Sequence, residues 1–389
     1  MKKSLSLLAA ALLAASTLSA QVRNEMKIPN IDGYITLKGD MHMHTIFSDA
    51  SVWPTTRVDE AVMEGLDFLC ITDHVDGRLH KYLNSGYFDP QKVDCNTSFK
   101  LAEKQAKGTG LILVPGGEIT SQIMPPGHFN ATFIKDANPI GSAMDAPGRD
   151  HQPEGLLAAA KIAKGQGAFL TWNHPHWCRQ APNETVFYQE HEQMVKDGLM
   201  DAVEVYNWWE GYSPEAHHWA IEHSLAIVSG TDSHHPMFMD IDFRAGELRP
   251  VTLVFAKERS LSGLREGLDA HRTAIFADGK VYGPEELILP LLKSCLRVEK
   301  IIWSEKTLKV YIYNRSSIPV TLDKAPGSEE WQMARHLTIN PFEHYMLQIY
   351  RLDKNDPLCT KVFDLHYTVD NFFTDADTPL GYVLHVDAE

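Results

Sequence analysis

The sequence predicts an α/β fold, a β/α barrel followed by a small antiparallel β domain. Short apolar segments alternate with amphipathic segments over roughly residues 36–270, which implies a parallel sheet with crossover helices. Histidines and carboxylates follow most of the apolar segments, at the strand ends where barrel enzymes build their sites. From Leu296 the pattern changes to alternating apolar and polar residues, which indicates strands with one buried face.

The N-terminal segment is typical of a secretory signal peptide. Lys2 and Lys3 precede an apolar run over Leu5–Ala15, and two small residues follow before Gln21. The run is shorter than the ~20 apolar residues that a membrane span requires, and no other stretch could cross a membrane. We therefore expect residues 1–20 to be removed and the mature protein to be exported to the periplasm.

Residues 21–294 contain the segments of the expected barrel. The predicted strands are Thr36–His42, Phe68–Thr72, Leu111–Pro115, Ala131–Ile134, Ala168–Trp172, Ala202–Val205, Ala226–Ser229 and Val251–Phe255. The predicted helices, several of which fall between these strands, are Thr56–Glu64, Ser98–Lys107, Pro153–Gly165, Gln189–Lys196, Pro214–Glu222 and Ser260–Ala270. Such sustained alternation favours a β/α barrel, with room for irregularity.

Residues 295–389 are predicted to form a separate β-sandwich-like domain. Segments such as Thr307–Asn314 alternate apolar and polar side chains, and turn-forming residues recur between them. No helical period appears after Leu296, and the boundary is expected to follow Pro284–Leu292. A small antiparallel sandwich or sheet packed on the barrel accounts for this pattern.

Composition and charge narrow the functional classes. With 389 residues, 44% hydrophobic and 22% charged, the chain has the make-up of a soluble globular protein of two or three domains. Its formal net charge is −15, and no stretch of basic residues occurs. Proteins that bind polyanions need clustered Lys and Arg to neutralise phosphates, so long nucleic acid is not expected as a partner.

Two motifs each place potential metal ligands two residues apart. His42 and His44 lie at the end of the first predicted strand, where residues i and i+2 share a face, and Asp49 is in the following loop. Asp232 and His234 repeat this geometry; a helix N-cap by Asp232 would explain one of the pair but not its partner. Imidazoles and carboxylates are ligands that zinc, manganese and iron(II) accept.

Four further candidates follow the intervening strands. His74 ends an apolar strand, and Asp73 beside it suits a supporting role, holding an imidazole through its free N–H. Glu118 follows two glycines and is a candidate bridging carboxylate, while His174 opens a His-Pro-His segment. His128 could equally belong to an ordinary loop. Since one site uses three or four protein ligands, nine candidates are enough for two or three ions.

Together these motifs resemble those of the polymerase and histidinol phosphatase (PHP) family over roughly residues 35–280. The resemblance rests on His42–Ser51, Gly65–His74, Gly116–Glu118, His174–Pro175, Glu204–Asn207 and Gly230–His234. It implies a distorted (β/α)7-type barrel, a trinuclear metal centre and phosphoester hydrolysis. Acceptable residue types occupy all nine ligand positions of the family pattern. One departure is Ala50, where the family usually has glycine, and it affects the geometry of a loop and not a ligand.

Within the family, Trp53–Arg57 and Val254–Arg259 look like segments of exported phosphodiesterases that cleave small alkyl or aryl phosphate diesters. The resemblance thus implies diester hydrolysis by a hydroxide at a centre of two or three divalent ions, manganese, zinc or iron. The alternatives are a phosphomonoesterase on the same centre and a secreted metal-binding or interaction protein without turnover.

The expected centre divides the ligands among its ions. One ion is held by His42, His44, Glu118 and Asp232, a second shares Glu118 with His74 and His128, and the centre is completed by Asp49, His174 and His234.

A substrate phosphate also needs cationic or donor groups nearby. Arg78, His80 and Lys81 follow the strand that ends at His74, and they are the candidates for binding the phosphate or protonating a leaving alkoxide. Arg179 is the next candidate. Each of these residues could instead be a solvated loop charge.

Three aromatic residues, Trp208, Trp209 and Tyr212, follow the sixth predicted strand. They are expected either to form an aromatic wall for the substrate or to pack between the barrel and the C-terminal domain. The sequence does not decide between these roles, so the size of the substrate stays open.

Overall fold

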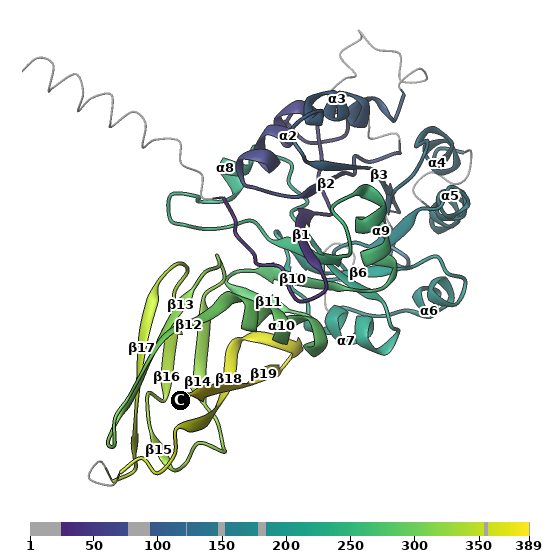
Figure 1. Cartoon of the computed structure of the whole chain (residues 1–389). Helices are drawn as coiled ribbons and strands as arrows, with labels where there is room; N and C mark the ends of the chain where they lie inside the picture. The colour runs from purple at the N-terminus through teal and green to yellow at the C-terminus, as the bar shows by residue number, and fades with distance from the viewer. Residues whose placement is uncertain are drawn as a thin grey trace, which may run out of the picture.

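A computed structural model describes residues 25–76, 94–121, 123–146, 152–177, 184–353 and 357–388. The predicted signal peptide lies outside these ranges, as do Arg78, His80, Lys81 and Arg179. Figure 1 shows strands surrounded by helices and, beside them, a C-terminal body made of strands. In the described part of the chain, no helix has both the length and the apolar character needed to span a bilayer.

All eight predicted barrel strands are present. They are β1 (Ile35–Asp40), β2 (Phe68–Ile71), β3 (Ile112–Thr120), β4 (His128–Thr132), β5 (Phe169–Trp172), β6 (Ala202–Asn207), β8 (Ala226–Gly230) and β9 (Val251–Ala256). Their order in the sheet is β9-β1-β2-β3-β4-β5-β6-β8. The hydroxyl of Thr252 on β9 bonds both the N–H and the carbonyl of Ser229 on β8, which brings the two ends of the sheet together.

The barrel sheet is mixed, in contrast to the parallel sheet that the alternation implied. β1, β2 and β3 are parallel, and so are β5, β6 and β8. β4, however, is antiparallel to β3 and β5, and β9 is antiparallel to β1. Only residues 121–127 connect β3 to β4, whereas a parallel connection needs a dozen or more residues. The short link therefore reverses the chain.

The six predicted helices lie within two residues of their expected bounds: α2 (Pro54–Met63), α3 (Thr97–Ala106), α5 (Pro153–Gly165), α6 (Gln189–Lys196), α7 (Pro214–Glu222) and α9 (Leu261–Asp269). The structure adds α4 (Asn138–Met144), α8 (Met237–Asp240) and α10 (Glu285–Cys295). Pro290 lies inside α10 and breaks the usual helix signal, although Ile288, Leu291 and Leu292 form a buried helical face.

Two sheets form the C-terminal domain, as the sequence predicts. One contains β12 (Leu296–Trp303), β13 (Leu308–Asn314), β15 (Trp331–Gln332) and β17 (His344–Arg351), all antiparallel. The other contains β14 (Val320–Lys324), β16 (His336–Ile339), β18 (Val362–Asp375) and β19 (Thr378–Asp387). Alternate residues of β13, Leu308, Val310 and Ile312, are buried in the core.

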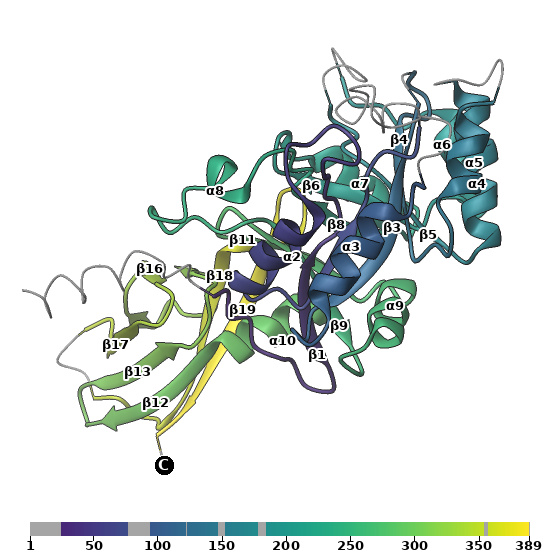
Figure 2. The same ribbon diagram turned by 90° about the horizontal axis from the view of Figure 1, so that it is seen from above.

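The second of these sheets continues into the barrel. β10 (Thr273–Ala277) and β11 (Lys280–Tyr282) form a hairpin beside β9, and β11 pairs in parallel with β18. Figure 2 shows β11, β18 and β19 running together between the two bodies. One apolar cluster contains Leu253 and Phe276 of the barrel side together with Leu308 and Phe372. The two domains therefore share both a sheet and a core.

Candidate metal centre

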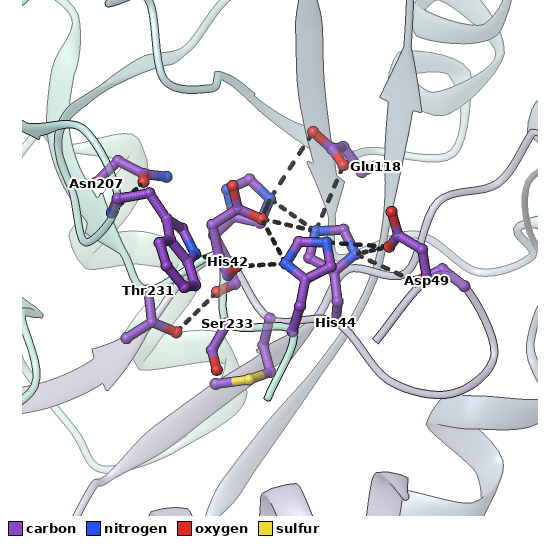
Figure 3. A network of polar contacts seen from close by, with 12 residues as sticks. His42, His44, Asp49, Glu118, Asn207, Thr231 and Ser233 are labelled. Atoms are coloured by element: carbon purple, nitrogen blue, oxygen red, sulfur yellow. Dashed lines mark hydrogen bonds and ion pairs between the residues drawn. The ribbon is translucent and has the colours of Figure 1, made fainter. Parts of the chain in front are cut away.

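The nine candidate ligands lie together at one end of the barrel. The chain supplies them in order: His42, His44 and Asp49 after β1, His74 after β2, Glu118 within β3, His128 at the start of β4, His174 after β5, and Asp232 and His234 after β8. His128 reaches this end because β4 is antiparallel, so that His128 pairs with Thr120 at the end of β3. Figure 3 shows His42, His44 and Asp49 gathered around Glu118.

Two imidazoles and two carboxylates are spaced as the ligands of a single ion would be. They belong to His42, His44, Asp232 and Glu118. The Nε2 atoms of the two imidazoles lie 3.1 Å apart, and Oδ1 of Asp232 lies 3.3 Å from His42 and 3.1 Å from His44. The Glu118 carboxylate approaches the same nitrogens at 3.8 and 3.5 Å. Ligands at about 2.1 Å from a tetrahedral ion lie about 3.4 Å from one another, so these residues fit one divalent cation.

A second group forms around the loop that follows β1. The Asp49 carboxylate lies 3.1 Å from Nε2 of His234 and 3.5 Å from Nε2 of His74. Together with His44, these residues offer donor atoms within 4.8 Å of one another. The division expected from the sequence placed His74 with a different ion. Here His74 lies beside Asp49 and His234 as well as Glu118, and the Ser51 N–H, which bonds to the His234 carbonyl, holds this loop against the end of β8.

Glu118 lies at the middle of the cluster and is 1% exposed. Its Oε1 lies 3.1 Å from Nδ1 of His128 and 3.5 Å from Nε2 of His174. Its Oε2 lies 2.8 Å from Nδ1 of His74. Because the same carboxylate also faces the imidazoles of the first group, it adjoins ligand groups on several sides. This is the position of a carboxylate that bridges metal ions.

The electrostatics of the cluster favour cations. Burial raises the pKa values of Asp49, Glu118 and Asp232, but the surrounding imidazoles lower them well below the ordinary range. Burial lowers the pKa of His42, yet the neighbouring carboxylates, Asp232 foremost, raise it to about 10. For His128 burial dominates and lowers the pKa to about 4. Ionised carboxylates beside imidazoles are a donor set for divalent ions.

Two local observations support metal binding by these residues. Nε2 of His128 and Nδ1 of His174 are buried and have no hydrogen-bond partner among the described residues, although buried polar atoms are nearly always paired. His174 and Asp232 also have positive φ angles, 30° and 50°, which are strained for residues other than glycine. The unpaired imidazole nitrogens leave buried donors available to a cation, so the donor set fits divalent ions.

Sequence reasoning assigned no role to Glu204 or Asn173, which orient ligands. Oε1 of Glu204 lies 3.2 Å from Nδ1 of His42, and Nδ2 of Asn173 donates to Oε1 of Glu118 at 3.0 Å. Glu204 belongs to Glu204–Asn207, a segment that matches the family pattern, and this match was the sequence feature that could have indicated its role.

Asp73 was expected to hold an imidazole through its free N–H, but no such bond is formed among the described residues. Its carboxylate accepts hydrogen bonds of 2.7 Å from the N–H and hydroxyl of Thr45 and from the hydroxyl of Ser48. The Ser48 hydroxyl lies 3.2 Å from Nδ1 of His44. Asp73 therefore acts on the ligand through Ser48, because the loop after β1 lies between the carboxylate and the ring.

A cavity of about 280 Å³ opens over the cluster. Among the described residues, its lining consists of candidate ligands together with Trp177, Trp209 and Glu210. Of the aromatic residues considered as a substrate wall, Trp209 alone is part of this lining. Trp208 lines a separate cavity beside the C-terminal domain, and Tyr212 stacks on a tyrosine of β11 with ring centroids 4.2 Å apart. Those two residues belong to the packing between the domains.

Both parts of the chain are similar to known proteins. Residues 296–385 match an Ig-like domain family. A two-domain protein from Bacteroides vulgatus, described as containing a predicted PHP-like metal-dependent phosphoesterase, is 38% identical in sequence. The match covers 94% of this chain and 100% of that chain, with a TM-score of 0.83. No curated protein sequence matches this chain.

More distant structures match about half of the chain. A candidate metal-dependent phosphoesterase from Bifidobacterium adolescentis is 19% identical, with 50% of this chain and 87% of that chain covered and a TM-score of 0.37. An amidohydrolase from Chromobacterium violaceum is 16% identical, with 51% of this chain and 88% of that chain covered and a TM-score of 0.34.

Proposed function

This chain belongs to the PHP-like metal-dependent phosphoesterase family, and on that premise we propose that it hydrolyses small phosphate diesters with the aid of two or three divalent metal ions. The observation that carries the proposal is the position of Glu118, a buried carboxylate with ligand groups on several sides. The groups share His42, His44, His174 and Glu118, which supports a centre of more than one ion. Manganese, zinc and iron(II) all suit this mixture of donors.

Divalent ions held by these residues would supply Lewis acidity toward phosphoryl oxygens and lower the pKa of water. The residues of the chain orient the reactants. Glu118 and Asp232 set the spacing of the donor groups, and Glu204 and Asn173 fix the orientation of ligand side chains. Burial of the cluster keeps bulk water away, so that fixed charges act more strongly on the phosphate.

The charge of the cavity supports a diester in preference to a monoester. Among the described residues that line it, the ionisable side chains are carboxylates and histidines, with no Lys or Arg. Beyond the divalent ions themselves, this lining therefore supplies no fixed side-chain cation to neutralise the second negative charge of a monoester, whereas a diester carries a single charge. A volume of about 280 Å³ lies at the small end of ligand pockets, which supports a small substrate.

Arg78, His80 and Lys81 are the groups we propose to bind the phosphate or to protonate the leaving alkoxide. Arg78 follows His74, a residue of the cavity lining, by four positions, and four residues of extended chain span at most about 14 Å. Replacement of Arg78 by Ala should lower kcat/KM while the metal content stays the same. Unaltered kinetics would remove Arg78 from the mechanism.

The decisive experiment compares a diester with its monoester. The mature protein is loaded with manganese, zinc or iron(II) in turn, its metal content is measured, and hydrolysis of bis(p-nitrophenyl) phosphate and p-nitrophenyl phosphate is followed. We expect faster turnover of the diester, loss of turnover in Glu118→Gln, and wild-type behaviour in Glu103→Gln, a matched change at an exposed position on α3.

Each other outcome selects a different function. Faster turnover of the monoester would support a phosphomonoesterase on the same centre. Bound metal without turnover of either compound would support a metal-binding or interaction protein. Absence of both metal and activity would overturn the proposal.

We also propose that the mature protein is exported to the periplasm after removal of residues 1–20. The N-terminal sequence pattern supports this location. Expression of the full chain in a Gram-negative host, followed by osmotic shock and mass spectrometry of the released protein, tests it. A cytoplasmic protein that retains Lys2 and Lys3 would contradict export.

A further inference from the structure

The rim of the cavity has a composition that metal binding does not explain. Trp177, Trp209 and Glu210 line it beside the candidate ligands, and none of the three belongs to a ligand group. Two indole rings and a carboxylate at the entrance of a phosphate-binding site therefore require a separate explanation.

Trp209 is held in place while much of its surface stays open. Its backbone N–H donates to Oδ1 of Asn207 at 2.9 Å, and its Nε1–H donates to the carbonyl of Asp232 at 3.0 Å. The residue is nevertheless 50% exposed. The turn between β6 and β7 (Gly211–Tyr212), in which Trp209 lies, is also bound to β8 through the N–H of Trp208 and the carbonyl of Gly230. The indole is thus fixed to the metal-site backbone and available to a ligand.

Trp177 is packed directly against ligand side chains. Its ring centroid lies 5.1 Å from that of His128 and 5.4 Å from that of His174. A group that contacts this indole is therefore close to the metal centre. The distance suits a substrate in which a short spacer separates the phosphorus atom from the group bound by the aromatic rings.

Glu210 places a carboxylate beside these rings, and no Lys or Arg among the described residues lines the cavity with it. The side chain is half-buried, and no ion pair or hydrogen bond to its carboxylate is formed among the described residues. Burial raises the pKa of Glu210, and although His174 and His176 lower it, Asp232 and Glu204 act in the same direction as burial. A positively charged ligand group would stabilise the ionised carboxylate in this setting.

We propose that Trp177, Trp209 and Glu210 receive an ammonium group, so that the preferred substrates are phosphate diesters in which one alkyl group carries a positively charged nitrogen. Indole faces attract ammonium groups through their quadrupole, and an adjacent carboxylate adds Coulombic attraction. The inference rests on the proposed diesterase function and specifies its substrate class. It also explains why a site for an anionic substrate has an anionic entrance.

A pair of isosteric substrates tests the inference. One is p-nitrophenyl phosphorylcholine, and the other is p-nitrophenyl 3,3-dimethylbutyl phosphate, in which a neutral carbon replaces the charged nitrogen. We expect the wild-type kcat/KM to be about tenfold or more higher for the cationic substrate. Glu210→Gln and Trp209→Leu should each reduce this ratio toward one. Because the ratio compares two substrates on the same variant, a general change in the activity of Glu210→Gln cancels and only the preference for the charged nitrogen is measured.

Glu222→Gln, an exposed change on α7, is the matched control and should leave the ratio unaltered. A wild-type ratio near one with good turnover of both compounds would overturn the inference and leave the diesterase function standing. Failure to hydrolyse either compound would count against the function itself. In that case titration with tetramethylammonium chloride, followed by tryptophan fluorescence, decides the inference. Saturable binding that Glu210→Gln weakens supports it, and lack of binding overturns it.

Discussion

Oε1 of Glu204 lies 3.2 Å from Nδ1 of His42, so that a buried carboxylate on β6 holds the imidazole of a ligand that follows β1. Its second oxygen accepts a 2.8 Å hydrogen bond from the backbone N–H of His174. With Nδ1 of His42 engaged in this way, Nε2 is the nitrogen that faces Asp232 and His44. Glu204 therefore positions ligands from two strands although it is not a candidate ligand itself.

Replacement of Glu204 by Gln tests this positioning role. The variant keeps the size of the side chain but removes the charge that favours the correct tautomer of His42. We expect metal affinity or kcat/KM to fall by about 10- to 100-fold. Metal titration and diester hydrolysis measure the effect, and Glu215→Gln, at an exposed position on α7, is the control. Unchanged metal affinity and activity in Glu204→Gln would show that packing alone orients the ring.

Gly230 allows the close approach of β8 to this pair. A Cβ atom at Gly230 would overlap both the Glu204 carboxylate and Cβ of His42, so Gly230→Ala must displace one of them. We expect a loss of about 1–3 kcal/mol in the free energy of unfolding, together with weaker metal binding. Gly381→Ala, on β19, meets no atom within 4 Å and should be near neutral in denaturant titrations. Equal stability of the two variants would contradict this account.

Arg57 connects the two loops that carry the His-x-His and Asp-x-His motifs. Its buried guanidinium donates to the carbonyls of His44 at 2.9 Å, Ser233 at 2.8 Å and His235 at 2.7 Å. Lys has a single ammonium group and lacks this planar fork, so Arg57→Lys should lower the free energy of unfolding by about 2–4 kcal/mol. The exposed substitution Arg297→Lys should change it by less than about 0.5 kcal/mol. Chemical denaturation of both variants tests the difference.

His191 should make the stability of the fold depend on pH. The ring stacks on Trp172 at 3.9 Å, its Nδ1 accepts from the N–H of Tyr188, and its Nε2–H donates to the carbonyl of Pro126. This pattern requires the neutral ring, and burial lowers its pKa to about 4. In the unfolded chain the pKa of this histidine is near 6.5. Between about pH 4 and pH 6.5 the unfolded chain therefore binds more protons than the folded chain. The stabilisation is therefore present above about pH 6.5 and is lost as the pH falls toward 4.

Unfolding free energies of metal-free wild type and His191→Gln at pH 7 and pH 4 measure this contribution. Wild type should lose on the order of 3 kcal/mol more than the variant over this range. Metal ligands titrate alike in both proteins, so the difference isolates His191. His218→Gln, at an exposed position, should follow wild type. A parallel decline of His191→Gln and wild type would exclude the proposed linkage.

The two domains should unfold in one transition. β11 pairs with β18, and the hydroxyl of Tyr206 on β6 donates to Asp278 in the β10–β11 turn at 2.7 Å. Phe372 on β18 is fully buried in the shared apolar cluster. Phe372→Ala should therefore lower the stability of the whole chain by about 3–5 kcal/mol and leave a single transition. Two transitions, by circular dichroism and tryptophan fluorescence, would show independent domains.

Parts of the fold could be read from the sequence because they depend on local patterns. The six predicted helices and eight predicted strands have a clear period of apolar residues, and each lies close to its expected position. α10 was not predicted because Pro290 interrupts the helix signal. In the folded chain, burial of Leu291 outweighs the local cost of a proline inside the helix. The antiparallel direction of β4 was not predicted, because strand direction depends on the length of a connection and on the neighbouring strands.

The sequence by itself determined which residues could bind metal, since each of the nine lies in a short motif beside a strand, and strand ends meet at one end of a barrel. Only the tertiary structure decided how they are grouped. His74 lies beside Asp49 as well as Glu118, and Asp49 in turn contacts His234, because the loop after β1 and the end of β8 meet there, a relation between segments far apart in the chain. The tertiary structure likewise decided that Trp209 lines the cavity over the cluster, while its neighbour Trp208 faces the C-terminal domain. Composition fixes the chemistry of a side chain, whereas its direction and its neighbours are set by packing.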